Sequence, residues 1–241
     1  MLSELINLLS GKGSIITLLA GLMASLVIIF LVSPLHELSH GFVANKLGDP
    51  TAKNMGRLTF NPIAHIDVVG AALIVFFGFG WAKPVPVNPN NFRNPKRDMA
   101  ITALAGPVSN LIAALIGGII YNIVYVILVS TGFIFSSEIG YTVSQFILIF
   151  INQYIGINIV LAVFNLIPFP PLDGSRIIGL ILPDSAMDFI YRYERVFFMI
   201  LIALMFTNVL DYVISVPMNA VYNGINWLSG LPFRIIFPQY F

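Results

Sequence analysis

The sequence predicts an all-α membrane protein, a polytopic helical bundle with about four full spans, a short re-entrant segment and a small β-hairpin. Hydrophobic residues make up 58% of its 241 residues and charged residues only 10%, whereas about 25% of an average soluble domain is charged. Several apolar runs reach the length of about 20 residues that a bilayer-crossing helix needs. The net charge of +1 leaves no basic surface for a polyanion. We therefore expect a lipid bilayer around the chain and no nucleic acid as a partner.

Four apolar runs account for the predicted full spans, at residues 14–42, 99–129, 141–167 and 196–216. A fifth run at 68–80 is too short to cross a bilayer comfortably. Its glycines and the prolines that follow indicate a segment that enters the membrane and returns: Gly70, Gly78, Gly80, Pro84 and Pro86. Non-helical backbone at that depth is tolerated only where protein or a wet cavity surrounds it. The segment is therefore expected beside a functional site.

The chain is expected to form a single integral membrane domain over residues 1–241, because it has no internal repeat and no long linker. Its core covers about 14–216, and the flanking segments 1–13 and 217–241 are expected as interfacial helices. The first segment has apolar positions at helical spacing and lacks the basic start and cleavage site of a signal peptide.

The distribution of lysine and arginine predicts the orientation. If the first span runs inward and the later spans alternate, only Lys12 and Arg234 fall outside. The inner side then carries Lys46, Lys53, Arg57, Lys83, Arg93, Lys96, Arg97, Arg176, Arg192 and Arg195. We expect a multi-pass protein of the cell membrane, with segments 36–40 and 170–176 both at the cytoplasmic end.

The stretch "HELSH", residues 36–40, carries the main chemical signal. Residues four apart share a helix face, so His36 and His40 can present two imidazoles to one ion, and Glu37 can reach a water on it. The chain has no cysteine, so a metal must be held by His, Asp or Glu. The alternative is a pair of interfacial histidines with a carboxylate facing headgroups. Ionisable residues at membrane depth favour the functional interpretation.

A catalytic zinc needs three protein ligands and an open position. Asp173 in "FNLIPFPPLDGSRI" is the best candidate for the third ligand, because it lies at a helix break on the same membrane side as the histidines. The alternative role for Asp173 is an N-cap, since Asp-Gly-Ser opens a new apolar run.

These motifs resemble the site-2 protease family of intramembrane zinc metalloproteases. The resemblance covers roughly residues 30 to 180 and includes "HELSH", "GRLTFNPIAHIDVVG", "GWAKPVPVNPNNFRNPKRDMAITALAGPVSN" and "NLIPFPPLDG". The two middle stretches look like the small prokaryotic branch of that family. Family members often carry a PDZ or a CBS domain, and this chain is expected to have room for neither. How substrates are selected without these domains stays open.

The resemblance implies one zinc ion per chain, bound by His36, His40 and Asp173, with Glu37 as general base. It implies hydrolysis of peptide bonds in transmembrane or membrane-associated proteins by a zinc-activated water. Asn165 would lie near the reacting carbonyl; its alternative role is hydrogen bonding between helices.

A substrate helix must unwind before its peptide bonds can be attacked. In "WAKPVPVNP", Val85 and Val87 alternate with prolines, which suits an edge strand that pairs with the unwound substrate. The alternative is an ordinary proline-rich loop. His65 could be a gating or inhibitory fourth ligand, a substrate contact or a satisfied interfacial histidine.

Two other functions stay open at this point: an inactive scaffold that grips transmembrane helices, and a zinc transporter. The scaffold would be marked by loss of Glu37 or a ligand, and all are present. A transporter would be expected to carry ligands along a route through the membrane, whereas these candidates gather at one end. The physiological substrate, the activating signal and the oligomeric state do not follow from the sequence.

Overall fold

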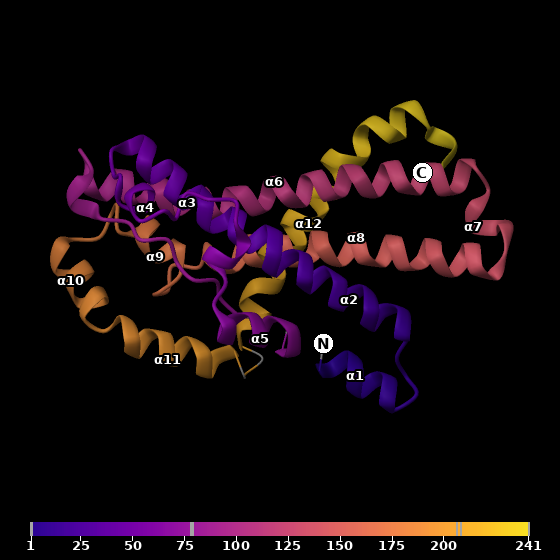
Figure 1. Ribbon diagram of the computed structural model, residues 1–241, viewed down its shortest axis with the longest axis horizontal. Helices are drawn as coiled ribbons and strands as arrows, with labels where there is room; N and C mark the ends of the chain where they lie inside the picture. The colour runs from indigo at the N-terminus through magenta and orange to yellow at the C-terminus, as the bar shows by residue number, and fades with distance from the viewer. Residues whose placement is uncertain (1, 78–79, 206, 208, 241) are drawn as a thin grey trace.

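The computed structural model describes residues 2–77, 80–205, 207 and 209–240, and it is a largely helical assembly (Figure 1). Three helical segments are long and apolar enough to cross a membrane: Ile15–Leu47, Pro95–Ser130 and Glu138–Asn165. They correspond to the first three predicted spans. The helical membrane architecture is therefore confirmed, while the total number of spans stays a prediction.

The first span is one continuous helical rod with a π-helical turn in its middle. It consists of α2 (Ile15–Val27), the π-turn (Ile28–Val32) and α3 (Ser33–Leu47). Pro34 lacks the N–H that would continue the regular hydrogen-bond ladder, which gives a local reason for the irregular turn. Gly48 ends α3 with a left-handed backbone, φ +112°. The short helices α1 (Leu2–Leu9) and α4 (Thr51–Asn54) flank this rod.

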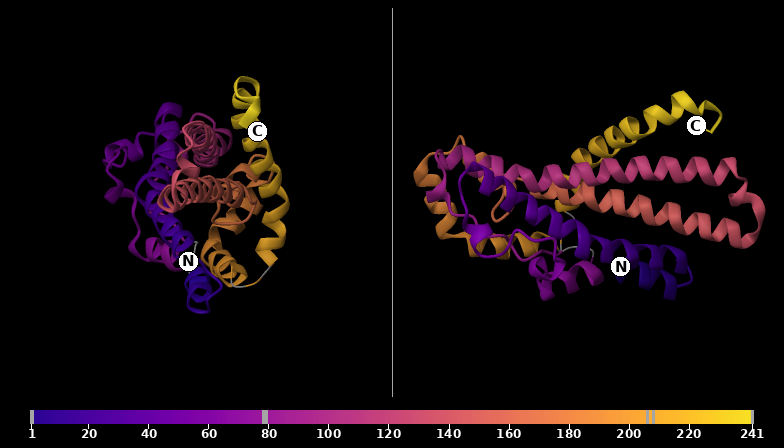
Figure 2. Two further views of the ribbon diagram at one scale, coloured as in Figure 1. Left: turned by 90° about the vertical axis from the view of Figure 1, so that its right-hand side faces the viewer. Right: turned by 45° about the horizontal axis from the view of Figure 1, so that its top comes forward.

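The second and third spans form an antiparallel hairpin, α6 (Pro95–Ser130) and α8 (Glu138–Asn165), joined through α7 (Phe133–Ser136). Both views in Figure 2 show the two helices side by side, and the hairpin projects beyond the rest of the fold at its α7 end. Ser137 caps α8 by accepting a hydrogen bond from the backbone N–H of Gly140. A third helix, α12 (Val209–Ile236), packs against the apolar seam of this pair. The contact is a buried cluster of Ala114, Ile151, Ile155, Ile159, Val163 and Ile225.

The predicted re-entrant region begins with a 3-10 turn at Pro62–His65 and a short apolar helix, α5 (Val68–Phe77). Gly78, part of that prediction, lies outside the described residues. The following residues, 80–88, have no regular secondary structure, and a 3-10 turn at Pro89–Asn91 precedes α6. Since the described part of the chain contains no β-strand, the predicted small hairpin is not confirmed.

The predicted fourth span, 196–216, is not a single helix. It is divided between α11 (Glu194–Met205) and α12 (Val209–Ile236), and Thr207 lies outside both helices. The 12 residues of α11 cover about 18 Å, less than the ~30 Å of a bilayer core. The predicted core boundary at residue 216 also falls inside α12. Hydropathy alone did not reveal this break, because the apolar composition continues across it.

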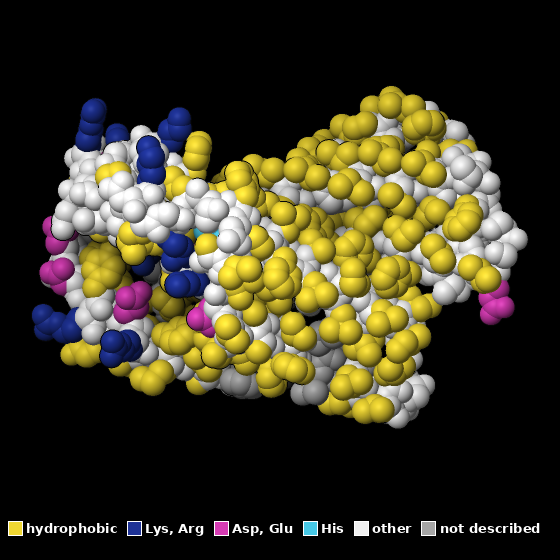
Figure 3. All heavy atoms as spheres, viewed as in Figure 1, with side chains coloured by type: hydrophobic (Ala, Val, Ile, Leu, Met, Phe, Trp, Pro, Cys, Tyr) yellow, Lys and Arg dark blue, Asp and Glu magenta, His cyan; other side chains and the backbone are white. Residues whose placement is uncertain are grey.

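The charged end of the molecule lies opposite the α7 end of the hairpin. In Figure 3 most visible Lys, Arg, Asp and Glu side chains gather where Figure 1 places α4, α10 (Asp184–Arg192) and the start of α6. The rest of the visible face is mostly hydrophobic, as a surface in contact with lipid tails must be. The short helix α9 (Asp173–Ile178) lies at the charged end, next to α3.

Candidate metal centre

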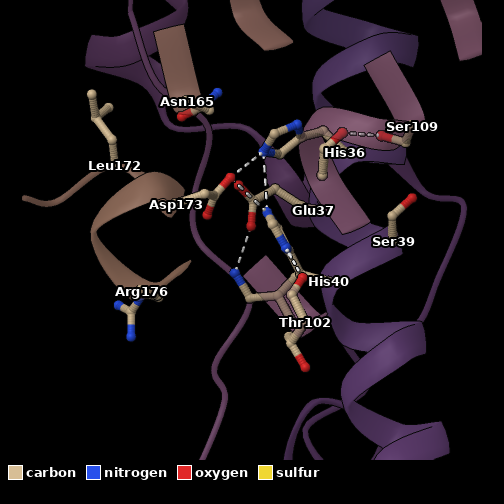
Figure 4. A network of polar contacts seen from close by, with 12 residues as sticks. His36, Glu37, Ser39, His40, Thr102, Ser109, Asn165, Leu172, Asp173 and Arg176 are labelled. Carbon is tan, nitrogen blue, oxygen red and sulfur yellow. Dashed lines mark hydrogen bonds and ion pairs between the residues drawn. The ribbon is translucent and has the colours of Figure 1, made fainter. Parts of the chain in front are cut away.

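Helix α3 presents His36 and His40 on one face, as their spacing of four residues requires. Their Nε2 atoms are 3.1 Å apart, and both residues are buried. Figure 4 shows the two rings turned toward the same point, with Asp173 approaching from α9. The structure therefore places the Nε2 atoms of the two predicted histidines where both can bind one metal ion.

Asp173 is the first residue of α9, and its carboxylate points at the histidines (Figure 4). Its Oδ2 lies 3.4 Å from Nε2 of His36 and 3.3 Å from Nε2 of His40. No side chain caps this helix through a hydrogen bond, so the N-cap alternative for Asp173 is not what the structure shows.

A tight backbone approach places Asp173. A Cβ added to Gly174 would lie 2.3 Å from the carbonyl oxygens of both Leu166 and Ile167. The chain after α8 therefore folds closely back on itself, and only glycine permits that approach at the residue after the aspartate.

The three donor atoms fit a zinc ion. A tetrahedral zinc with bonds of about 2.0–2.1 Å holds its ligand atoms about 3.3 Å apart. The observed separations of 3.1, 3.3 and 3.4 Å match that value. Within the described residues, His36, His40 and Asp173 are the group suited to holding a metal, and Oδ2 of Asp173 has no hydrogen-bond partner there. The donor set is that of a catalytic zinc site with three protein ligands.

Helix α6 orients the histidines from the other side. The carbonyl of Thr102 lies 2.8 Å from Nδ1 of His40. Because a carbonyl can only accept, Nδ1 carries the proton and Nε2 keeps its lone pair for a metal. One turn later, a Cβ added to Gly106 would lie 2.4 Å from the His40 ring and 2.5 Å from the His36 ring. The absence of a side chain at Gly106 thus lets α6 approach the metal site closely.

Glu37 lies beside the ligand group and is not part of it. Its Oε2 accepts a 2.8 Å hydrogen bond from the backbone N–H of Val85 (Figure 4). The backbone N–H of Val85 is therefore engaged with the general-base candidate in this conformation. That Val85 and Val87 pair with a substrate strand stays a prediction. The side chain of Val85 is buried against Gly41 of α3.

The segment around Val85 is held to the protein at several backbone groups. The N–H of Lys83 donates to the carbonyl of His65, and its carbonyl accepts from Arg57, each over 2.8 Å. The N–H of Asn88 donates to Asp49 over 2.7 Å. The segment is thus a positioned element and not a free loop.

Asp49 is the buried anchor for this segment, just beyond the end of α3. Burial alone would raise the pKa of its carboxyl, but hydrogen bonds from Asn91, Thr51 and Asn88 hold the pKa below its usual value. Asp49 therefore stays ionised and keeps the segment in place at neutral pH.

A cavity of about 480 Å³ adjoins the ligand group. Its lining includes Glu37, Val87 and Asn165, together with the three candidate ligands. Asn165 ends α8 and donates from Nδ2 to the carbonyl of Leu161 over 3.0 Å, which leaves a second amide hydrogen. The cavity also includes Asn110 of α6, which the sequence analysis did not select.

His65 is placed elsewhere. It is fully buried, and its Nε2 lies 2.9 Å from the carbonyl of Thr59. It lines a small cavity that adjoins the large one, since Asp67 and Trp81 line both, and it does not belong to the metal-suited group. Its Nδ1 has no hydrogen-bond partner among the described residues, and a gating or inhibitory role for His65 stays a prediction.

The fold and this centre define a membrane-embedded protein with a site of the zinc-hydrolase type. Residues 23–207, well over half of the chain, match the model of Peptidase family M50. The chain is also 42% identical over 200 residues to "Putative zinc metalloprotease YwhC" of Bacillus subtilis (strain 168), covering 83% of this chain and 88% of that protein. No solved structure matches it significantly.

This chain therefore belongs to Peptidase family M50, the site-2 protease family. It is a zinc metallopeptidase and a membrane protein, and its substrate is a protein. The family resemblance stated from the sequence motifs is confirmed.

Proposed function

We propose that this protein is an intramembrane endopeptidase that hydrolyses peptide bonds of transmembrane or membrane-associated proteins. The observation that carries the proposal is the position of Glu37. It lines the same cavity as His36, His40 and Asp173, in the C-terminal half of a bilayer-length helical rod. A peptide bond that enters this cavity would meet a base and a metal site together.

In this proposal His36, His40 and Asp173 hold one zinc ion. When bound, zinc lowers the pKa of its water toward about 7 and polarises the substrate carbonyl. Glu37 accepts the proton from the attacking water, and the N–H of Val85 keeps the carboxylate of Glu37 oriented. The free amide hydrogen of Asn165 stabilises the negative charge that develops on the carbonyl oxygen.

The 84–87 segment is the proposed substrate-binding edge. Val85 uses its N–H internally, so the substrate pairs with the remaining backbone groups of the segment, including Val87 and the proline carbonyls. Val85 and Val87 both line the cavity, which supports a peptide lying along this segment. A substrate strand held there would be unwound and within reach of Glu37.

We place the site on the cytoplasmic side of the cell membrane. The support is that the charged end of the molecule carries the site (Figure 3), while Lys12 lies in the turn between α1 and α2 and Arg234 in the last turn of α12. The ligand atoms gather at one point, which favours a peptidase over a zinc transporter.

The experiment is cleavage of transmembrane peptides by the purified full chain, with and without a chelator. Glu37→Gln should lower the cleavage rate by about 10²- to 10⁴-fold or more, because the amide cannot accept a proton. Zinc content measured by elemental analysis should stay at one per chain. Glu138→Gln at the distant start of α8 is the matched control and should cleave normally.

Two results would contradict this proposal. Cleavage by Glu37→Gln at near the wild-type rate would remove Glu37 as the base. Absence of chelator-sensitive cleavage by the wild type on every peptide would favour the inactive-scaffold alternative.

A further inference from the structure

Asn110 of α6 has an unusual environment for a polar side chain in a membrane-spanning helix. It is 1% exposed, and neither Nδ2 nor Oδ1 has a hydrogen-bond partner among the described residues. Burying an amide without a partner is costly, and most buried polar groups are hydrogen-bonded. The amide of Asn110 therefore needs a partner that the folded chain does not provide.

Other asparagines in these helices show how that need is normally met. Asn122, Asn158 and Asn165 each donate from Nδ2 to the carbonyl four residues earlier. The corresponding carbonyl for Asn110 is that of Gly106, which accepts a 2.7 Å hydrogen bond from the Ser109 hydroxyl instead. The side chain of Asn110 therefore does not form the hydrogen bond to the carbonyl four residues earlier that the other three asparagines form.

The location of Asn110 indicates what the missing partner is. Thr102, Gly106 and Asn110 are spaced by four residues and share one face of α6. Thr102 accepts from His40, Gly106 packs on both imidazole rings, and Asn110 follows one turn further along. Asn110 also lines the cavity that contains Glu37 and Asn165. The unpartnered amide therefore lies at the wall of the candidate active site.

We propose that Asn110 is a substrate-contacting residue that hydrogen-bonds a backbone peptide group of the unwound substrate beside the bond to be cleaved. This inference rests on the proposed peptidase function. Along one edge, an asparagine amide offers an N–H donor beside a C=O acceptor, which is the complement of the C=O and N–H that one residue of an extended strand presents on the same side. An unwound segment in an apolar environment has these same groups unpaired.

Pairing of the two would satisfy both partners at once. The contact would complement the 84–87 segment, which binds the substrate from another wall of the cavity. In this low-dielectric setting a hydrogen bond is stronger than it is in water. Asn110 would thus favour a substrate that has already lost its helical hydrogen bonds over an intact helix.

The test compares Asn110→Leu with Asn158→Leu in the full-length protein. Both changes replace an equally buried asparagine of a membrane-spanning helix by an apolar residue of similar size, and Asn158 does not line the cavity. Asn110→Leu should bind and cleave a transmembrane peptide about 10- to 100-fold less well, as expected for a lost buried hydrogen bond. Its zinc content should be unchanged, and its melting temperature unchanged or higher. Asn158→Leu should cleave within about threefold of the wild type.

A second measurement identifies the contacted group. Peptides in which single amides near the cleavage site are replaced by esters lack one N–H each. At the contacted position the ester should weaken binding to the wild type, while Asn110→Leu should no longer distinguish the ester from the amide. Equal ester effects in both proteins at every position would overturn the proposal.

Binding is also measured with Glu37→Gln and with the Glu37→Gln, Asn110→Leu double variant. This comparison does not require cleavage, so it tests Asn110 even if the wild type hydrolyses no peptide. Equal peptide affinity of the two, as expected if Asn110 merely holds a water, would overturn the contact. So would a loss of zinc or melting temperature in Asn110→Leu, or an equal loss of activity in Asn158→Leu.

Discussion

The two halves of the metal centre are built in different ways. His36 and His40 come from a single turn of α3, inside a helical rod long enough to cross a membrane. Asp173 comes from the start of a six-residue helix that follows a proline-rich turn. The first half depends on helix periodicity, and the second depends on how the chain beyond α8 folds back and packs against α6.

This difference shows where the site is sensitive. The histidine pair has its spacing set by the helix itself, and α6 only orients the rings through Thr102 and Gly106. The position of Asp173 depends on the backbone contact at Gly174. Changes that spare α3 but disturb this turn should therefore separate the aspartate from the histidines.

Removal of one ligand from either half should have the largest effect on zinc binding. Asp173→Ala and His40→Ala each leave two protein ligands. We therefore expect zinc affinity to fall by more than the about 10- to 100-fold that is typical when a residue hydrogen-bonded to a ligand is replaced. Elemental analysis and a competing chelator measure the loss. Asp184→Ala, at an exposed carboxylate paired with Lys96, is the control. Wild-type affinity in Asp173→Ala would remove Asp173 from the ligand set.

Three glycine-to-alanine changes should sharpen the comparison. Gly174→Ala places a Cβ on rigid backbone carbonyls, so it should displace Asp173 and lower both zinc content and cleavage by more than tenfold. Gly106→Ala meets imidazole rings instead, which can shift slightly, so its effect on cleavage should be smaller. Gly156→Ala has nothing within 4 Å and is the control.

The expected order is therefore Gly174, then Gly106, then Gly156. For the last we expect normal cleavage and a helix more stable by about 1 kcal/mol, the usual difference between alanine and glycine. Zinc content, cleavage rate and melting temperature are measured for each variant. Equal effects of Gly174→Ala and Gly156→Ala would mean that the turn does not position Asp173.

Proline substitutions should separate two roles within the 84–87 segment, and they should have the smallest effects of the series. Val85→Pro removes the N–H that holds Glu37, so it should lower kcat by about tenfold with little change in KM. Val87→Pro removes a group proposed to pair with substrate, so it should raise KM. Threonine at either position keeps the N–H and the branched side chain and should be milder. If both proline variants changed only KM, the Val85 bond would have no role in placing Glu37.

Much of the site could be predicted because its signals are local. The histidine spacing identifies a shared helix face, and the absence of cysteine restricts the ligand types. The helix break at Asp173, on the same predicted membrane side as the histidines, made it the candidate third ligand, and the family resemblance implied the same ligand set. The link of Val85 to Glu37 could not be predicted, since it joins residues 48 positions apart and depends on the path of a segment without regular structure.

The division of the 196–216 run shows a different limit. Hydropathy indicates the solvent that a segment prefers, but it does not indicate that one helix ends at Met205 and the next begins at Val209. The same limit applies to Asn110. Its residue type is visible in the sequence, but its lack of a partner follows only from the Ser109 bond to Gly106 and from the packing around α6.

The sequence by itself determined the apolar helices, the paired histidines on one helix face and the kind of metal they suit, because these depend on composition and on a repeat of 3.6 residues. Only the tertiary structure decided which distant groups meet. In the folded chain Asp173 lies beside the histidines, and the N–H of Val85 donates to Glu37. His65 does not line the cavity that contains Glu37, and the side chain of Asn110 has no hydrogen-bond partner among the described residues. The physical reason is that such contacts depend on how separate segments pack, and no periodicity within one segment specifies its neighbour.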